Sequence, residues 1–276
     1  MPEPVKKPWR LLEATLKDTR KTKFQAAVLP FGATEAHNLH LPYGTDNYQI
    51  EALCDRACGY AWKKGARVAL LPHIPYGCDQ NLMEFPMTIS IEQSWLDMLV
   101  KSVAESLEKH GVHKLIVVNG HGGNNFNQGI RSLYGRTKVF ICALNFYTMM
   151  SDVGKEIFEY PGEHADEMET SLMQELAPHL VQMQDADDGA TYPSRFEAAN
   201  RGWVWYPRPF DRLTTNSGYG YPKKATAAKG RKYIAALEER MGGFFVDLAR
   251  AKMDKDFPFD RSKPPGQRGK PGGGHA

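Results

Sequence analysis

The stretch Ala26-Ala-Val-Leu-Pro-Phe31 is a continuous apolar run that ends at Gly32. A run of this length, bounded by a turn residue, is typical of a strand that is buried on both faces. The segment that follows, Glu35-Ala-His-Asn-Leu-His-Leu-Pro-Tyr-Gly-Thr-Asp46, contains two carboxylates and two imidazole rings. We therefore expect a buried strand that leads into a loop carrying the chemistry of the protein.

Further apolar runs continue this pattern along the chain, with helical repeats of apolar residues between them. The expected strands are 23–31, 67–71, 114–118 and 138–144, and the expected helices are 47–64, 91–110, one that ends near Tyr134, one opened by 162–171, and a closing helix at 223–253. Alternating strands and helices are typical of a mostly parallel sheet covered by helices on both faces. The fold class is therefore expected to be α/β.

The chain has 276 residues, enough for one large domain, which we place at 1–255. Residues 256–276 are rich in proline and glycine and are expected to form a flexible tail. The net charge of +3 is small and the basic residues are scattered, which argues against nucleic acid as a partner. No stretch approaches the roughly 18 apolar residues of a membrane span, and the N-terminus lacks a signal-peptide core, so we expect a cytoplasmic protein.

Two polar loops follow expected strands, and they supply the candidate metal ligands. Glu35 and His37 are two residues apart, so in an extended backbone their side chains leave on the same face. Asp46 can fold back onto them, and His121 follows the strand at 114–118. Ligands bind outside the carboxyl ends of parallel strands, which predicts that these four side chains converge. Carboxylate and imidazole ligands suit zinc, manganese or iron.

The segment Gly162-Glu-His-Ala-Asp-Glu-Met-Glu-Thr-Ser171 is acidic and then apolar, and it is expected to open a helix. Helical spacing would place His164 and Glu167 along one face, where both can serve one site. We thus expect two divalent metal ions per chain, with zinc first and manganese or iron as alternatives. Their expected ligands are Glu35, His37, Asp46, His121 and Glu167, with Asp46 bridging, and His164 is the expected catalytic acid.

Other interpretations of four segments remain open at this stage. The loop 35–46 is also compatible with a polar surface loop, and the acids of 163–169 with stabilisers of a helix N-terminus. The loop Asn119-Gly-His-Gly-Gly-Asn124 is compatible with phosphate binding, although it lacks the Walker lysine and the dinucleotide-binding spacing. The aromatic-rich segment 192–221 is compatible with a lid, a subunit contact or plain packing.

Five motifs together resemble the creatininase (creatinine amidohydrolase) family. They are Leu29-Pro-Phe-Gly-Ala-Thr-Glu35, His37 to Asp46, Asn119 to Asn124, His164-Ala-x-Glu167-x-Glu169-Thr-Ser171 and Gly220 to Gly230. The resemblance implies a three-layer α/β/α sandwich with a mostly parallel central sheet. It also implies a two-metal hydrolase of amide C–N bonds, commonly a homohexamer, that acts on a small molecule.

Three departures separate this chain from the creatinine-cleaving members. Gly123 stands where those members carry a glutamate ligand, so the resemblance moves that role to Glu167. Tyr160-Pro161 replaces a Trp-Asp pair, and Asp166 replaces a glycine. The chain therefore resembles the branch with a Gly-Gly loop, whose substrates include formamides, peptides and oxidised inositols. The alternatives are a metal-dependent hydrolase or lyase acting on a keto-sugar or keto-inositol, and a non-catalytic protein that retains the fold.

Overall fold

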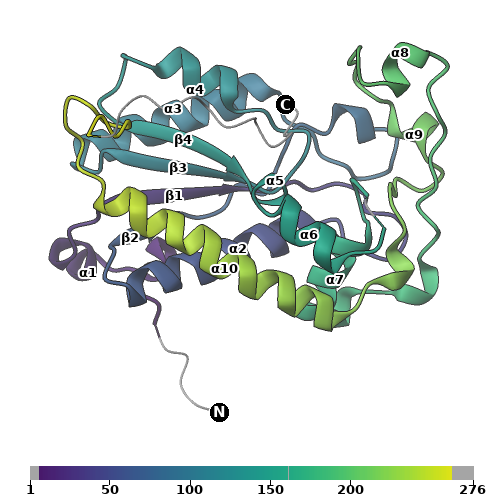
Figure 1. The fold of residues 1–276 in the computed structure, drawn as a ribbon, viewed down its shortest axis with the longest axis horizontal. Coiled ribbons are helices and arrows are strands. Elements are labelled where there is room, and N and C mark those ends of the chain that lie inside the picture. Colours follow the sequence, from purple (N-terminus) through teal and green to yellow (C-terminus); the bar gives the residue numbers. More distant parts are fainter. Residues whose placement is uncertain (1–5, 161, 263–276) are drawn as a thin grey trace.

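A computed structural model describes residues 6–160 and 162–262, and its centre is a parallel sheet of four strands (Figure 1). The order across the sheet is β2-β1-β3-β4, and every neighbouring pair is parallel. The strands are β1 (Ala26–Phe31), β2 (Val68–Leu70), β3 (Lys114–Asn119) and β4 (Phe140–Asn145). Strand order reverses between β1 and β3, the position in such sheets where ligands bind at the carboxyl ends.

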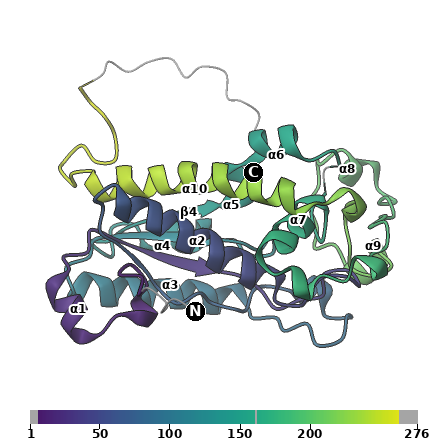
Figure 2. The same cartoon turned by 90° about the horizontal axis from the view of Figure 1, so that it is seen from below.

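Helices cover both faces of this sheet, which makes three layers (Figures 1 and 2). The helices α2 (Thr45–Lys63), α7 (Glu167–Leu176) and α10 (Ala227–Arg250) pack together on one face, and α3 (Gln93–Lys109) and α4 (Asn127–Leu133) lie on the other. The α/β/α sandwich is thus confirmed. The remaining helices are short: α1 (Leu16–Lys21), α5 (Phe146–Met149), α6 (Ser151–Ile157), α8 (Glu197–Asn200) and α9 (Phe210–Leu213).

Successive residues of a strand point to opposite faces, so β1 contributes to two separate cores. Val28 packs in the core beneath α2 and α10, whereas Leu29 packs in the core beneath α3. All six residues of β1 are buried, as are all six of β3. Continuous burial explains why β1 and the interior of β3, residues 115–118, are apolar rather than alternating, as is usual when helices cover both faces.

The four predicted strands and the helices α2, α3 and α10 agree with the structure to within a few residues at each end, whereas the helix expected from 162–171 begins only at Glu167. On α2, five residues of the helical apolar repeat are completely buried: Ile50, Leu53, Cys54, Ala57 and Ala61. Gly111 ends α3 with a left-handed φ of +73°, a conformation that glycine adopts at low cost. Not every apolar residue of these helices is buried, since Trp95 is 63% exposed on the first turn of α3.

The segment between α7 and α10 forms a long excursion at one end of the molecule, where α8 and α9 lie (Figure 1). Thr191 and Thr214 pair as an antiparallel bridge, and the Tyr192 amide donates to the Leu213 carbonyl over 2.9 Å. These contacts hold the two ends of the segment 191–214 side by side. Three of its aromatic side chains are exposed, namely Phe196 (69%), Trp203 (72%) and Trp205 (84%), whereas Phe210 is buried.

Two predictions concern features outside the sheet. Among the described residues, no helix is both long enough and apolar enough to cross a membrane. The expected tail at 256–276 lies mostly outside the described part of the chain, which ends at residue 262.

Candidate metal centre

The loop after β1 carries Glu35 and His37, and a close contact with α2 brings Asp46 beside them. The Asn47 side chain donates to the Ala33 carbonyl over 2.7 Å, which ties the first turn of α2 to the end of β1. A Cβ atom at Gly32 would lie 2.2 Å from Asn47 Oδ1, so only glycine permits this approach. The loop and the helix therefore present their polar side chains to one small volume.

Glu35, His37, Asp46 and His121 converge as predicted. Asp46 Oδ1 lies 3.1 Å from His37 Nε2, and Asp46 Oδ2 lies 3.2 Å from His121 Nδ1. Glu35 Oε1 lies 2.8 Å from His121 Nδ1. All four side chains are buried, so this is an enclosed site rather than a polar surface loop.

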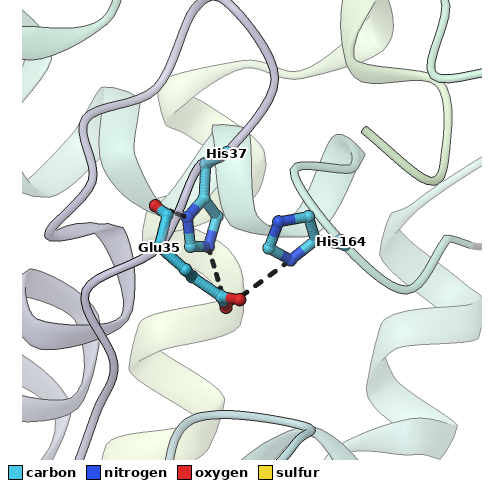
Figure 3. A group of neighbouring side chains, drawn as sticks. All are labelled: Glu35, His37 and His164. Carbon is cyan, nitrogen blue, oxygen red and sulfur yellow. Dashed lines mark hydrogen bonds and ion pairs between the residues drawn. The ribbon is translucent and has the colours of Figure 1, made fainter. Parts of the chain in front are cut away.

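His164 also reaches the cluster, from the segment just before α7. Its Nδ1 lies 3.8 Å from Glu35 Oε1, and its ring centroid lies 4.2 Å from that of His37. Figure 3 shows the Glu35 carboxylate facing both rings. On its other side, His164 meets the edge of Phe210 from α9, with ring centroids 5.6 Å apart. The excursion therefore contacts the candidate site directly.

In each histidine of the cluster, the ring nitrogen that faces away from the other ligand candidates contacts a backbone carbonyl. His37 Nδ1 lies 3.1 Å from the Glu35 carbonyl, His164 Nε2 lies 2.7 Å from the Ala36 carbonyl, and His121 Nε2 lies 3.3 Å from the Cys78 carbonyl. A carbonyl oxygen only accepts, so these nitrogens carry the protons. In the neutral ring, the opposite nitrogen then presents a lone pair to the centre of the cluster, as a metal ligand must.

The structure corrects the predicted place of Glu167, which does not join this cluster. Its carboxylate forms an ion pair with Lys229 and accepts hydrogen bonds from the amides of Glu159 and Tyr160. Helical spacing was the basis for pairing His164 with Glu167, but α7 begins only at Glu167, so His164 lies outside the helix. The argument from helical periodicity therefore did not apply.

Glu169 occupies the position that was expected of Glu167. Its Oε2 lies 3.8 Å from His37 Nε2 and accepts a hydrogen bond from the Ala165 amide over 2.6 Å. Ligand atoms of His37, Asp46 and Glu169 lie within 4.8 Å of one another, as do those of Glu35, Asp46 and His121. Two groups of possible ligands therefore share Asp46.

The electrostatics of the cluster fit a cation. Burial raises the pKa of Glu35 to about 7 and that of Glu169 to about 8, because a buried carboxylate loses its hydration. Burial alone would lower the pKa of His37, but Asp46, Glu169 and Glu35 raise it to about 10. Both Glu35 carboxylate oxygens and Asp46 Oδ2 are buried without a hydrogen-bond partner, a costly arrangement that metal ligation would relieve.

The loop 119–124 is built around the His121 ring. A Cβ atom at Gly123 would lie 2.2 Å from the Cys78 carbonyl and 2.4 Å from His121 Nε2. The Asn119 side chain accepts from the His121 amide and donates to the His121 carbonyl. These contacts account for the glycine without a phosphate ligand, and they leave no room for a glutamate at position 123.

Asp166 serves as the N-cap of α7. Its Oδ1 accepts a hydrogen bond from the Glu169 amide over 2.9 Å, and burial raises its pKa to about 6. The carboxylate therefore fixes the first turn of the helix that carries Glu169.

Two residues near the cluster were not found from the sequence. Asp79 Oδ1 lies 2.8 Å from His121 Nε2. Burial raises the pKa of the Tyr147 hydroxyl, and the negative charges of Asp46 and Glu169 add to this shift. Asp79 belongs to the loop that follows β2, and Tyr147 follows β4. The rule that singled out the ends of β1 and β3 would have found them, had it been applied to all four strands.

Comparison with known proteins identifies the family. The family model for creatininase, described as creatinine amidohydrolase, matches residues 12–244. The 3-dehydro-scyllo-inosose hydrolase of Thermotoga maritima is 31% identical, over 91% of this chain and 85% of its own. The mycofactocin precursor peptide peptidase of Mycobacterium tuberculosis is 29% identical, over 76% of this chain and 80% of its own.

Solved structures agree with this result. A Bacteroides fragilis protein assigned provisionally as a creatinine amidohydrolase has a TM-score of 0.86 at 34% identity, over 91% of this chain and all of its own. A manganese form of creatininase has a TM-score of 0.72 at 22% identity, over 89% of this chain and all of its own, and this likeness supports the fold alone. Sequence and fold lead to one conclusion: the chain belongs to the creatininase family of amidohydrolases.

Proposed function

We propose that this protein hydrolyses the C–N bond of a small cyclic or linear amide with the help of two divalent metal ions. The observation that carries the proposal is the shared position of Asp46, whose two oxygens face different histidines at 3.1 and 3.2 Å. One carboxylate that belongs to two groups of ligands is the arrangement expected of a bridging residue. The proposed ligands are Glu35, Asp46 and His121 for one ion, and His37, Asp46 and Glu169 for the other.

Zinc is the first choice of metal, with manganese and iron as alternatives, because all three accept oxygen and nitrogen ligands. Metal ions in such a site polarise a carbonyl group and lower the pKa of bound water to about 7. The protein contributes the geometry: carbonyls 35, 36 and 78 orient the three histidine rings, and Asp166 anchors the helix that carries Glu169.

His164 is the proposed proton carrier. Burial lowers the pKa of His164 to about 3, so its ring is neutral at neutral pH. Because Nε2 donates to the Ala36 carbonyl, Nδ1 is the atom free to take a proton. We therefore propose that His164 first accepts a proton at Nδ1 and then delivers it to the departing nitrogen. In this proposal His164 acts first as a base and then as an acid, whereas the sequence led us to expect only the acid.

The substrate is proposed to be an amide other than creatinine, because Gly123 and Tyr160 stand where creatinine-cleaving members carry a glutamate and a tryptophan. A keto-inositol is the second candidate. It is favoured by the Thermotoga maritima relative, which matches 91% of this chain and is named as a 3-dehydro-scyllo-inosose hydrolase.

The test of the proposed function begins with metal content. Elemental analysis of the purified protein should find about two divalent ions per chain, and fewer in Asp46→Ala. The metal-loaded protein is then assayed with small formamides, cyclic amides and oxidised inositols. Release of ammonia or an amine supports amide hydrolysis, whereas a carboxylic acid formed only from an oxidised inositol would favour the second candidate. A protein that binds no metal after reconstitution would overturn both.

We also propose that the chain forms a homo-oligomer, in which another copy covers the excursion near α8. Several large aromatic side chains there are exposed in the single chain, including Phe196, Trp203 and Trp205. Exposed aromatic groups that gather in one segment are typical of association surfaces.

A further inference from the structure

Among the three histidines of the cluster, His121 has one contact that the others lack. In all three rings, the nitrogen that faces away from the cluster contacts a backbone carbonyl. In His121 this nitrogen, Nε2, also lies 2.8 Å from the carboxylate oxygen Oδ1 of Asp79. The opposite nitrogen of the same ring faces Glu35 and Asp46. The ring of His121 therefore stands between a carboxylate on one side and the metal ligands on the other.

Asp79 is buried in a way that requires an explanation. Its exposed fraction is 0%, and neither carboxylate oxygen has a hydrogen-bond partner of good geometry in the described structure. An unpaired buried carboxylate is costly, and a buried charge is normally held near an opposite charge or a metal centre. His121 is the ion-pair partner that the structure provides.

The backbone around Asp79 holds this side chain in place. The Asp79 amide donates to Ser90 Oγ over 2.8 Å, and its carbonyl accepts from the Leu82 amide over 2.9 Å. Gly77 makes the contact possible, because a Cβ atom there would lie 2.8 Å from the His121 ring. Hydrogen bonds thus hold both the amide and the carbonyl of Asp79, and its carboxylate faces the His121 ring.

We propose that Asp79 is a positioning residue for the metal centre, acting through His121. Its carboxylate, together with the Cys78 carbonyl, holds the proton on Nε2 and so keeps the lone pair of Nδ1 directed at the ion shared by Glu35 and Asp46. A carboxylate behind a ligating histidine fixes the orientation of the ring and makes it a stronger donor. The inference rests on the metal site of the proposed function, but not on the identity of the substrate.

The experiment measures zinc affinity of the full-length protein by competition with a chromophoric chelator. Asp79→Asn preserves the shape of the side chain and removes its charge. We expect one of the two zinc ions to bind about 10 to 100 times more weakly, the usual effect of losing such a partner. The other ion, held by His37 and Glu169, should keep its affinity to within a few-fold.

Asp55→Asn is the matched control. Asp55 is also a buried carboxylate, but it accepts from Trp9 Nε1 over 2.8 Å and pairs with Lys7, outside the cluster. Its substitution should leave the affinities of both zinc ions unchanged. The melting temperature of each metal-free variant separates positioning from a purely structural role, because a structural role would lower that temperature without selectively weakening one zinc ion.

The outcomes are distinguishable. Wild-type protein that binds no zinc, manganese or iron would overturn the proposed function itself. Wild-type protein that binds two zinc ions, with Asp79→Asn folded and binding both within twofold of the wild type, would overturn the role of Asp79 alone. If Asp79→Asn does not fold, the smaller Asp79→Ser is measured in the same way and is expected to show the same selective loss.

Discussion

Glu167 and Glu169 lie two residues apart on the first turn of α7, yet their carboxylates lead to different parts of the molecule. Glu167 pairs with Lys229 at the start of α10, and Glu169 lies 3.8 Å from His37 in the candidate metal centre. Residues i and i+2 of a helix point in nearly opposite directions, which explains the division. One of these acids joins two helices, and the other faces the cluster.

This division predicts different consequences for two similar substitutions. Glu169→Gln should lose one of the two metal ions and nearly all activity. Glu167→Gln should keep both ions but lose about 1–3 kcal/mol of stability, because it removes the charged partner of Lys229. Metal content and urea unfolding of the two variants provide the measurement. If Glu167→Gln lost an ion while Glu169→Gln kept both, the assignment of the ligands would be wrong.

Neighbouring glycines provide a second test. Gly123→Ala should displace the His121 ring or the Cys78 carbonyl, with a loss of about 1–3 kcal/mol in stability and weaker metal binding. Gly122→Ala is the control, since a Cβ atom there meets no other atom within 4 Å. Thermal unfolding and zinc titration should show a clear effect for Gly123 only, and equal effects at both positions would contradict the packing described around His121.

We expect His40 to contribute to the dependence of the folding stability on pH. Burial lowers its pKa to about 4, from 6.5 in the unfolded chain, and its Nε2 contacts Thr170 Oγ1 at 2.9 Å. Below pH 6.5 the unfolded state takes up the proton first, so stability should fall as the pH decreases from about 6.5 to about 4, by up to about 3 kcal/mol. Above pH 6.5 the contribution is complete.

Urea unfolding of the wild type and of His40→Gln between pH 4 and pH 7 isolates this contribution. The variant should show a shallower dependence on pH than the wild type across that window. Identical slopes in the two proteins would mean that His40 titrates normally in the folded state.

The exposed aromatic groups near α8 predict the assembly state. Light scattering of the wild type should give a mass several times that of one chain, and Trp205→Ser should weaken the assembly. Tyr134→Ser is the control, because Tyr134 is 93% exposed at the end of α4, away from the excursion. A monomeric wild type at micromolar concentration would contradict the proposed contact between copies.

The sequence was sufficient to predict the sheet, because parallel strands such as β1 and β3 are buried on both faces and read as unbroken apolar runs. It also predicted the four ligand candidates that follow β1 and β3, since the carboxyl ends of neighbouring parallel strands meet at one edge. This inference needed only the order of the elements, not their detailed packing.

The choice between Glu167 and Glu169 needed the start of α7 to within one residue. That start is set by the Asp166 cap, and element ends are the least certain part of a prediction from sequence. Asp79 was missed for a different reason: the rule of strand ends was not applied to the loop after β2. Its contact with His121 also depends on Gly77 and Ser90, which no periodic pattern encodes.

The contact between Thr191 and Thr214 has a consequence for how substrate preference evolves in this family. The chain leaves at Thr191 and returns at Thr214, beside it. We therefore expect that the residues between them can be replaced without moving the loops and helices that carry the proposed ligands. Phe210 places this segment against His164. We expect its exchange to alter the shape of the proposed active site and to leave the proposed metal ligands in place. We therefore expect replacement of this segment to change the substrate preference while the proposed metal chemistry is kept.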